Sequence, residues 1–189
     1  MTVASNTLPL ISGEVYHIYN RAISKEKLFI EDQDHVRFLK NIKDFILPHS
    51  QIYAYCLLNN HFHLLLRINN ADQFSKKLAD ASNSYSRYFN IKYNRRGGLF
   101  MRPFKRKLIK DDANLSWITW YIHQNPLHHK LTEDWQNWKW SSYKAYTSDS
   151  NTLLDTTFLL DFFGDREAFI KHHQINLKAW IQNAGRQSF

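Results

Sequence analysis

The sequence of 189 residues predicts an α+β fold: a ferredoxin-like antiparallel sheet with helices on one face, followed by a C-terminal helical tail. Two observations lead to this class. Short aromatic and β-branched runs alternate with longer amphipathic stretches in the order strand, helix, strand, strand, helix, strand, helix, which contains two strand–helix–strand units. Hydrophobic residues make up 43% of the chain and charged residues 22%, so a packed core is expected and general disorder is not.

The first strand is predicted over residues 14–20, which are aromatic and β-branched. Residues 31–47 are predicted to form an amphipathic helix that Pro48 ends, because apolar side chains recur at spacings of three and four. The apolar stripe of this helix consists of Val36, Leu39, Ile42, Phe45 and Ile46, widened by Phe38.

A hairpin follows the first helix. Residues 51–58 and 61–68 read as strands, and Asn59-Asn60 can form the two-residue turn between them because asparagine tolerates a positive φ. Residues 71–94 are expected to form the second helix, with its apolar side chains along one side.

The last strand and helix of the fold are predicted from residues 95–126. A loop at 95–98 leads into a basic strand at 102–109. Asp111-Asp112 can cap a helix over 113–124, and Pro126 is expected to stop it. The second strand–helix–strand unit and a closing helix follow from this order.

The chain is expected to divide into a domain over residues 1–146 and a C-terminal helical extension over 147–189. Short helical patterns are present in residues 155–182. Trp135, Trp138 and Trp140 are expected to fasten the tail to the domain, as are Tyr143 and Tyr146.

The charge balance points to a polyanionic partner. Twenty-five Lys and Arg against 17 Asp and Glu leave a net charge of +8, which favours nucleic acid first and an anionic membrane second. No apolar run approaches the ~20 residues of a membrane span, and the N-terminus does not resemble a signal peptide. We therefore expect a soluble cytoplasmic protein with no membrane partner. The single cysteine, Cys56, excludes an internal disulfide and is expected to be a buried, inert thiol.

His61 and His63 are the first pair that could carry chemistry. Residues i and i+2 of a strand face the same side, so two neutral imidazoles could converge on one metal ion. The same spacing also fits two ordinary histidines on a half-exposed sheet face, and both interpretations stay open on spacing alone.

Tyr121 and Asn125 form the second pair, four residues apart on one face of the last predicted helix. Read alone, this pair is most simply explained by a tyrosine that packs in the core and an asparagine that caps the helix. Read with His61 and His63, the pair predicts a divalent ion held by two imidazoles and the Asn125 carbonyl, with the Tyr121 phenol one helical turn away. A phenol has an ordinary pKa near ~10, so it needs cationic surroundings or a metal to act as a nucleophile.

A basic stretch interleaved with Phe100 and Phe104 is the candidate nucleic-acid surface, because it would pair phosphate contacts with stacking rings. The residues predicted to contact nucleic acid are Asn20, Arg21, Arg95, Arg96, Arg102, Lys105, Arg106 and Lys107. Arg87, on the second predicted helix, is interpreted as plain surface.

Five blocks of the sequence together resemble one family. His61-Phe62-His63 resembles the HUH motif (histidine, hydrophobic, histidine) of single-tyrosine transposases. Tyr121-Ile122-His123-Gln124-Asn125-Pro126 is similar to the Tyr-Ile-x-x-Asn-Pro block of the REP-associated tyrosine transposases, and residues 138–143 to their Trp-x-Trp-Ser-Ser-Tyr segment. Residues 16–21 and 98–106 resemble their first strand and the entry to their fourth.

The resemblance implies the HUH endonuclease fold and a reaction. Tyr121 would attack a phosphate of single-stranded DNA carrying hairpins and form a 5′-phosphotyrosine intermediate. His61, His63 and Asn125 would be ligands of Mg²⁺ or Mn²⁺. The resemblance also implies a monomer, with a dimer as the alternative, and association with the nucleoid if the source is bacterial.

One departure from the family pattern lies just after the catalytic block. The family continues with Val-x-Ala-Gly-Leu, whereas this chain has Leu127-His128-His129-Lys130-Leu131, so either histidine could act as a supplementary ligand. Two other functions stay open: a nucleic-acid-binding module of the RNA-recognition kind, and a domesticated transposase that binds hairpins without cutting. Cleavage of a labelled single strand separates the enzyme from both.

Overall fold

The computed structural model describes residues 9–24, 26–148, 152 and 154–174. The strands are β1 (Val15–Arg21), β2 (Ser50–Leu58), β3 (His61–Ile68) and β4 (Lys105–Leu108). The α-helices are α1 (Asp32–Asn41), α2 (Ala71–Lys92), α3 (Asp112–His128), α4 (Tyr143–Thr147), α5 (Thr157–Phe163) and α6 (Arg166–His173). Three short helices of other geometry are η1 (Ile42–Ile46), η2 (Leu47–His49) and η3 (Trp135–Asn137).

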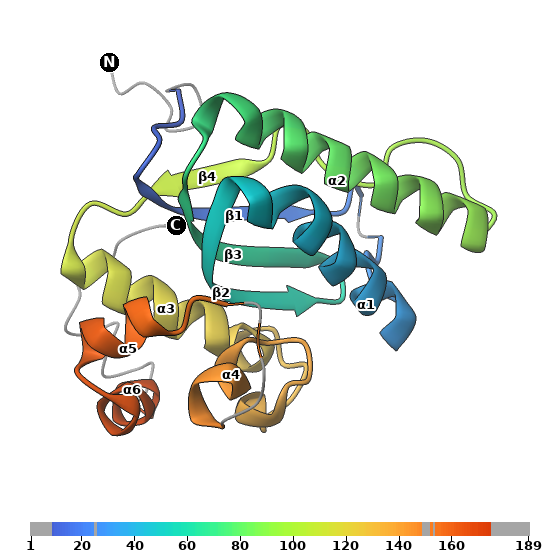
Figure 1. Cartoon of the computed structure of the whole chain (residues 1–189). Helices are drawn as coiled ribbons and strands as arrows, with labels where there is room; N and C mark the ends of the chain where they lie inside the picture. Colours follow the sequence, from blue (N-terminus) through green and yellow to red (C-terminus); the bar gives the residue numbers. More distant parts are fainter. Residues whose placement is uncertain (1–8, 25, 149–151, 153, 175–189) are drawn as a thin grey trace, which may run out of the picture.

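The four strands form one antiparallel sheet in the order β2-β3-β1-β4 (Figure 1). This is the order that two interlocked strand–helix–strand units produce, so the predicted α+β, ferredoxin-like class is confirmed. The β1–β3 register places Tyr19 opposite His63 and Arg21 opposite His61. β3 is a central strand, which fixes the backbone of both candidate metal ligands from two sides.

Helices cover both faces of the sheet rather than one, which corrects the prediction in this detail (Figure 1). α1 and α2 pack on the face that carries Ile18, Leu57 and Phe62. α3, α5 and α6 pack on the opposite face, against Leu58 and Leu65. The physical reason is that β2 and β3 carry apolar side chains on both faces of the sheet, so helices must pack on each face to exclude water.

The first helix differs from its prediction in two ways. The α-helix ends at Asn41 and continues as η1 and η2 to His49, so Pro48 lies inside the final turn. Pro48 fits because it occupies the start of η2, where an amide hydrogen has no intrahelical partner to lose. Val36 is 58% exposed and does not belong to the apolar stripe, whereas Phe38 is buried.

The second strand–helix–strand unit also differs at two prolines. β4 begins only at Lys105, because Pro103 cannot donate to a strand ladder. The prediction that Pro126 stops the last helix is wrong, since α3 continues to His128 with Pro126 buried in its last turn. There a proline removes a single amide donor, and the bond from the Leu131 amide to the Pro126 carbonyl closes the end. Asp111 caps the start of α3, as predicted.

The segment after α3 is tied to β2, the other edge of the sheet. The Leu57 amide donates to the Trp140 carbonyl, and the Trp138 indole donates to the Leu57 carbonyl. Phe169 of α6 is buried in the same core as α3. Residues 175–182 of the predicted helical patterns lie outside the described residues.

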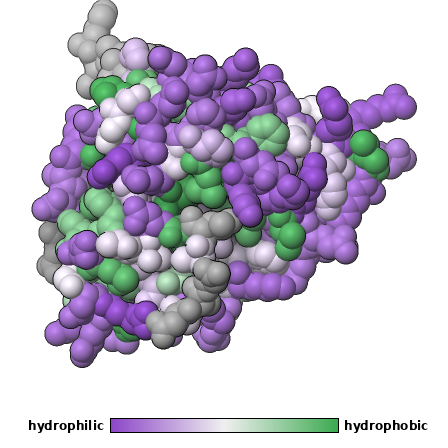
Figure 2. Space-filling model, viewed as in Figure 1, coloured by the Kyte–Doolittle hydropathy of each residue, from purple (hydrophilic) through white to green (hydrophobic). Residues whose placement is uncertain are grey.

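Figure 2 shows a mostly hydrophilic surface with small, separated hydrophobic patches. Within the described residues, no helix is long and apolar enough to cross a membrane. Cys56 is a buried free cysteine, and burial raises the pKa of its thiol well above the ordinary value. The expectation of an inert thiol agrees with this environment.

Candidate active site

A cavity of about 460 Å³ opens where the ends of β1 and β3 meet α3. It is lined by Tyr19, Asn20, Arg21, Asn60, His61, His63, Met101, Arg102, Pro103, Lys105, Tyr121 and His129. Three of the four residues predicted to carry the chemistry therefore face one space. The fourth, Asn125, lies one turn along α3 from Tyr121 and is fully buried.

The sheet and α3 bring the predicted residues together. His61 and His63 lie on the same face of β3, with ring centroids 5.1 Å apart. The Tyr121 ring approaches His63 edge-on at 5.6 Å and stacks on Trp117 at 4.8 Å. Because Trp117 is one turn earlier on α3, this stacking holds the phenol against the histidine face.

A histidine that the sequence analysis missed supports His63. His17 of β1 is buried, and its Nε2 lies 2.8 Å from His63 Nδ1. When the His63 Nδ1–H donates to His17, the lone pair of His63 is at Nε2, on the side of the ring away from His17. The signal was available in the alternation of β1, which places His17 on the same face as Tyr19. Its partner on β3 could not be known without the strand register.

Asn60 and Asn125 act on His61 in a similar way. The His61 Nδ1–H donates to the Asn60 side-chain carbonyl at 2.7 Å, which leaves a lone pair at Nε2. Asn125 makes a polar contact with His61, and its Nδ2 donates to the Tyr121 carbonyl at 2.8 Å. The hairpin turn and α3 thus orient the same imidazole.

The residues present fit a divalent cation. His63 Nε2 and Asn125 Oδ1 are buried and lack a hydrogen-bond partner among the described residues. A buried polar atom of this kind is costly unless something binds it. No group of three or more His, Cys, Asp or Glu able to hold a metal is present in the described part of the chain. The polar atoms that the described residues offer to an ion here are the two imidazole nitrogens and the Asn125 side-chain oxygen.

Burial keeps the imidazoles in the neutral form that metal binding requires. Desolvation lowers the pKa of His61 to about 4 and that of His63 well below its ordinary value. Desolvation, and secondarily the charge of Lys107, lowers the pKa of His17 to about 3. At neutral pH all three rings are therefore neutral.

The candidate nucleophile, the Tyr121 phenol, is partly buried in the free protein. Burial raises the pKa of the Tyr121 phenol, and a hydrogen bond with Asn125 partly opposes this effect. Tyr121 is therefore a neutral phenol in the free protein, and ionisation needs positive charge brought into the cavity.

The basic residues of β4 divide between the two faces of the sheet. Lys105 and Lys107 pair with Tyr19 and His17 of β1 and share the face of the cavity. Arg106 pairs with Ile18 and lies on the opposite face, where its guanidinium is 5.8 Å from the Phe104 ring centroid. The predicted basic surface is thus two surfaces joined by the edge strand.

The residues before β4 line the cavity or support its wall. Arg21 and Arg102 are exposed and line it, and Arg102 Nη2 donates to Asn83 at 2.9 Å. Asn20 is buried and donates to the Met101 carbonyl, so it holds the 101–103 segment against β1. Arg21 is close enough to lower the pKa of His61 as a secondary cause.

Arg95 and Arg96 differ in environment. Arg95 donates to Glu26 at 2.5 Å and to the carbonyls of Gly97 and Gly98, so its side chain holds the loop. Gly97 has a φ of +88°, a conformation that a side chain would strain. Arg96 is exposed. Neither side chain lines the cavity, and the Arg95 guanidinium is already hydrogen-bonded to other residues of the protein.

Two further residues of the cavity were not assigned to it by sequence. Tyr19, interpreted as strand packing, stacks on His17 and lines the wall. His129 lies 4.5 Å from His61 between ring centroids, whereas His128 contacts the rings of Trp120 and Tyr121. Of the two candidate supplementary ligands, only His129 faces the cavity.

Comparisons with known proteins give one relative by sequence. No protein-family model matches the chain. Over 100 residues it is 30% identical to a curated Haemophilus influenzae protein whose name assigns it to the REP-associated tyrosine transposases. The match covers 48% of this chain and 57% of that protein, so the chain spans little more than half of this relative's length.

A solved structure shares the fold. A REP-associated tyrosine transposase bound to a REP hairpin matches the fold with a TM-score of 0.63 and 14% sequence identity. The match covers 81% of this chain and 94% of that one. At this identity the likeness establishes the fold, which agrees with the fold expected from the motifs. Over about half of its sequence this chain is similar to one REP-associated tyrosine transposase, and in its fold it is similar to another.

Proposed function

We propose that this protein nicks and joins single-stranded DNA through a covalent phosphotyrosine intermediate formed on Tyr121. The observation that carries the proposal is that Tyr121, His61 and His63 of a single chain line one cavity, with Asn125 buried one turn along α3 from Tyr121. Because one chain supplies all four residues, a monomer is sufficient for the chemistry.

The proposed step exchanges one phosphodiester for another. The Tyr121 phenolic oxygen attacks the phosphorus, the P–O3′ bond breaks, and a 5′-phosphotyrosine and a free 3′-hydroxyl result. The phenol loses one proton and the 3′ oxygen gains one, so the exchange needs no oxidant or energy source. Reversal with a different 3′-hydroxyl joins strands. The Trp117 stack and the His63 edge contact keep the phenol aimed into the cavity.

His61, His63 and the Asn125 side-chain oxygen would hold the divalent ion, Mg²⁺ or Mn²⁺. When bound there, the ion supplies positive charge that polarises a phosphoryl oxygen and favours the ionised phenol. His17 and Asn60 support this role by occupying the Nδ1 atoms of the two imidazoles. Such second contacts orient metal-binding histidines.

The proposed substrate is a DNA hairpin with unpaired flanks. The solved neighbour is bound to a REP hairpin, which supports a hairpin partner. Arg21, Arg102 and Lys105 line the cavity with positive charge, which suits a phosphate backbone.

The test is the Tyr121→Phe variant, which keeps the ring and its stacking and removes only the attacking oxygen. We expect it to bind a labelled hairpin DNA as the wild type does and to form no covalent adduct. Mass spectrometry of the wild-type adduct should locate the DNA on the peptide that contains Tyr121. An adduct on another tyrosine contradicts the mechanism, and hairpin binding with no cleavage by the wild type favours the non-cleaving alternative.

A further inference from the structure

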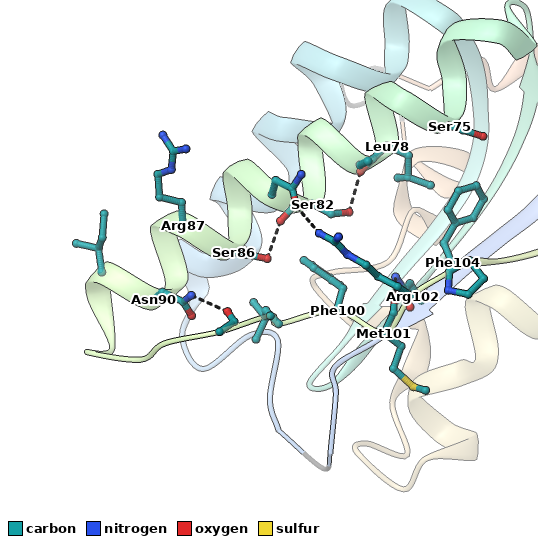
Figure 3. Close-up of a pocket in the computed structure, with 18 residues that line it drawn as sticks. Ser75, Leu78, Ser82, Ser86, Arg87, Asn90, Phe100, Met101, Arg102 and Phe104 are labelled. Carbon is teal, nitrogen blue, oxygen red and sulfur yellow. Dashed lines mark hydrogen bonds between the residues drawn. The ribbon is translucent and has the colours of Figure 1, made fainter.

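A second and larger cavity, of about 870 Å³, lies between α2 and the segment 97–104 (Figure 3). One wall is the face of α2 that carries Ser75, Ser82 and Ser86. The other is the loop that leads into β4. The chemistry proposed above does not use this groove, and the sequence analysis interpreted Arg87 on its α2 wall as plain surface.

The groove adjoins the candidate active site. Asn20, Met101, Arg102 and Pro103 line both cavities, so the two lie next to each other at the 101–103 segment. β4 is the edge strand of the sheet, and nothing in the described residues pairs with its outer side. A ligand that leaves the active site can therefore pass around this edge without crossing a strand.

The charges of the groove suit a phosphate backbone. Arg87 and Arg102 line it, and no aspartate or glutamate is among the described residues that do so. Arg102 Nη2 donates to the side chain of Asn83 on α2, and Figure 3 shows the Arg102 guanidinium between the two walls. Arg106 lies near Phe104 on the same face of the sheet.

The remaining lining suits unpaired bases. Phe104 is half-buried at the end of the groove and offers a ring for stacking. The Ser82 and Ser86 hydroxyls donate to backbone carbonyls of α2, which leaves their oxygens as acceptors for base amino groups. A duplex stem would not use these features, because its base faces are already stacked.

We infer that this groove binds the unpaired nucleotides that continue from the nicked phosphate, with Arg87 and Arg102 on the backbone and Phe104 under a base. The inference rests on the proposed function, since it names the path of the same DNA strand. It assigns single-strand recognition to the α2 face of the sheet and strand cleavage to the α3 face.

The experiment compares two labelled DNAs by fluorescence anisotropy at one salt concentration. One is a blunt hairpin. The other is the same hairpin extended by about six unpaired nucleotides at its 5′ or its 3′ end. One single-strand-binding domain covers a single strand of this length. The variants are Arg87→Ala, which removes a charge from the groove, and Ala79→Glu, which adds a carboxylate at an exposed lining position. Lys76→Ala is the matched control, because it removes an exposed charge of α2 outside the groove.

The wild type should bind a hairpin extended at one of its ends, the 5′ or the 3′ end, more tightly than the blunt hairpin. Arg87→Ala and Ala79→Glu should weaken binding of the extended hairpin about five- to tenfold and leave the blunt hairpin unchanged. Lys76→Ala should behave as the wild type, and thermal melting should show that all variants fold.

Equal affinity of the wild type and Ala79→Glu for the extended hairpin overturns the groove assignment and leaves the proposed nicking function standing. Equal weakening for both DNAs also overturns it, because the groove would then serve the stem. If the wild type binds neither DNA, the proposed function itself fails.

Discussion

Among the described residues, two buried histidine pairs have a similar spacing, one at the cavity and one between α3 and α6. His17 and His63 are 2.8 Å apart between ring nitrogens, and His123 and His173 are 2.9 Å apart. Burial lowers the pKa of all four imidazoles, so each pair is neutral at pH 7. The two pairs differ only in what their outer nitrogens meet.

The pair in the tail contact is fully satisfied. His173 Nδ1 donates to the Phe169 carbonyl, His123 Nδ1 donates to His173, and the Ser142 hydroxyl donates to His123 Nε2. The Tyr55 amide in turn donates to Ser142. Every donor points the same way, so α6, α3 and β2 are joined by one continuous chain of hydrogen bonds.

The pair at the cavity is incomplete. His17 Nδ1 and His63 Nε2 have no hydrogen-bond partner among the described residues, and Asn125 Oδ1 beside them has none either. Unpaired buried polar atoms each cost about 1–3 kcal/mol. The contrast teaches that a completed histidine pair stabilises the fold, whereas an incomplete pair keeps donor atoms available for a ligand at the expense of stability.

The largest expected effect is on cleavage. His63→Ala or His61→Ala should remove detectable metal-dependent nicking, because two ligands are too few to hold the ion in place. His123→Ala should nick as the wild type does per folded molecule. A gel assay with Mg²⁺ and Mn²⁺ measures this, and Mn²⁺ should support at least equal activity because imidazole favours the softer ion. Full activity in both site variants would sink the metal assignment.

The second expected effect is on the free energy of unfolding, which His123→Ala should lower more than His63→Ala does. His123→Ala should lower the free energy of unfolding by about 2–4 kcal/mol, since it opens a cavity and removes the hydrogen-bond partner of His173 Nε2. His63→Ala should lose less, because its outer nitrogen was already unpaired. Urea unfolding at pH 7.5 gives both values, with His172→Ala, a half-buried neighbour, as the control. An equal loss in both pairs would contradict the distinction.

The third effect concerns the partner of His63. His17→Ala should weaken Mn²⁺ binding about 10- to 100-fold, as loss of a supporting contact to a metal-binding histidine does. His17→Asn, which keeps a polar group near His63, should recover part of the affinity. Titration calorimetry without DNA separates this from any effect on substrate, and unchanged Mn²⁺ affinity in His17→Ala would show that the pair has no role in binding.

The smallest effect is the pH dependence that both pairs share. Folded His17 and His173 have a pKa of about 3, against 6.5 for an ordinary histidine. Above 6.5 neither state binds the proton; below it the unfolded chain does and the folded chain does not, so stability falls between pH 6.5 and about 3. The expected loss between pH 7.5 and 6 is about 1 kcal/mol per histidine. His173→Gln should flatten the profile, and a slope equal to that of the wild type would contradict this.

Local pattern was sufficient for most of the fold. The hairpin over residues 50–68 was predictable because alternation and a two-asparagine turn are local properties. The continuation of α3 through Pro126 was not, because a proline's penalty is offset there by burial among distant residues. The position of α3 on the second sheet face followed from the apolar residues on both sides of β2 and β3, a signal present in the sequence and not used.

The sequence by itself determined which residues are candidates for the chemistry. His61 and His63 share a face because strands alternate, and Tyr121 and Asn125 share one because helices repeat every 3.6 residues. Only the tertiary structure decided that these two faces meet, that His17 supports His63, and that Arg95 is held by its own loop while Arg87 lines a groove. The His17–His63 contact joins residues 46 positions apart, and the meeting of the two faces depends on which elements are neighbours. Periodicity specifies which way a side chain points, whereas strand order and packing specify what it finds there.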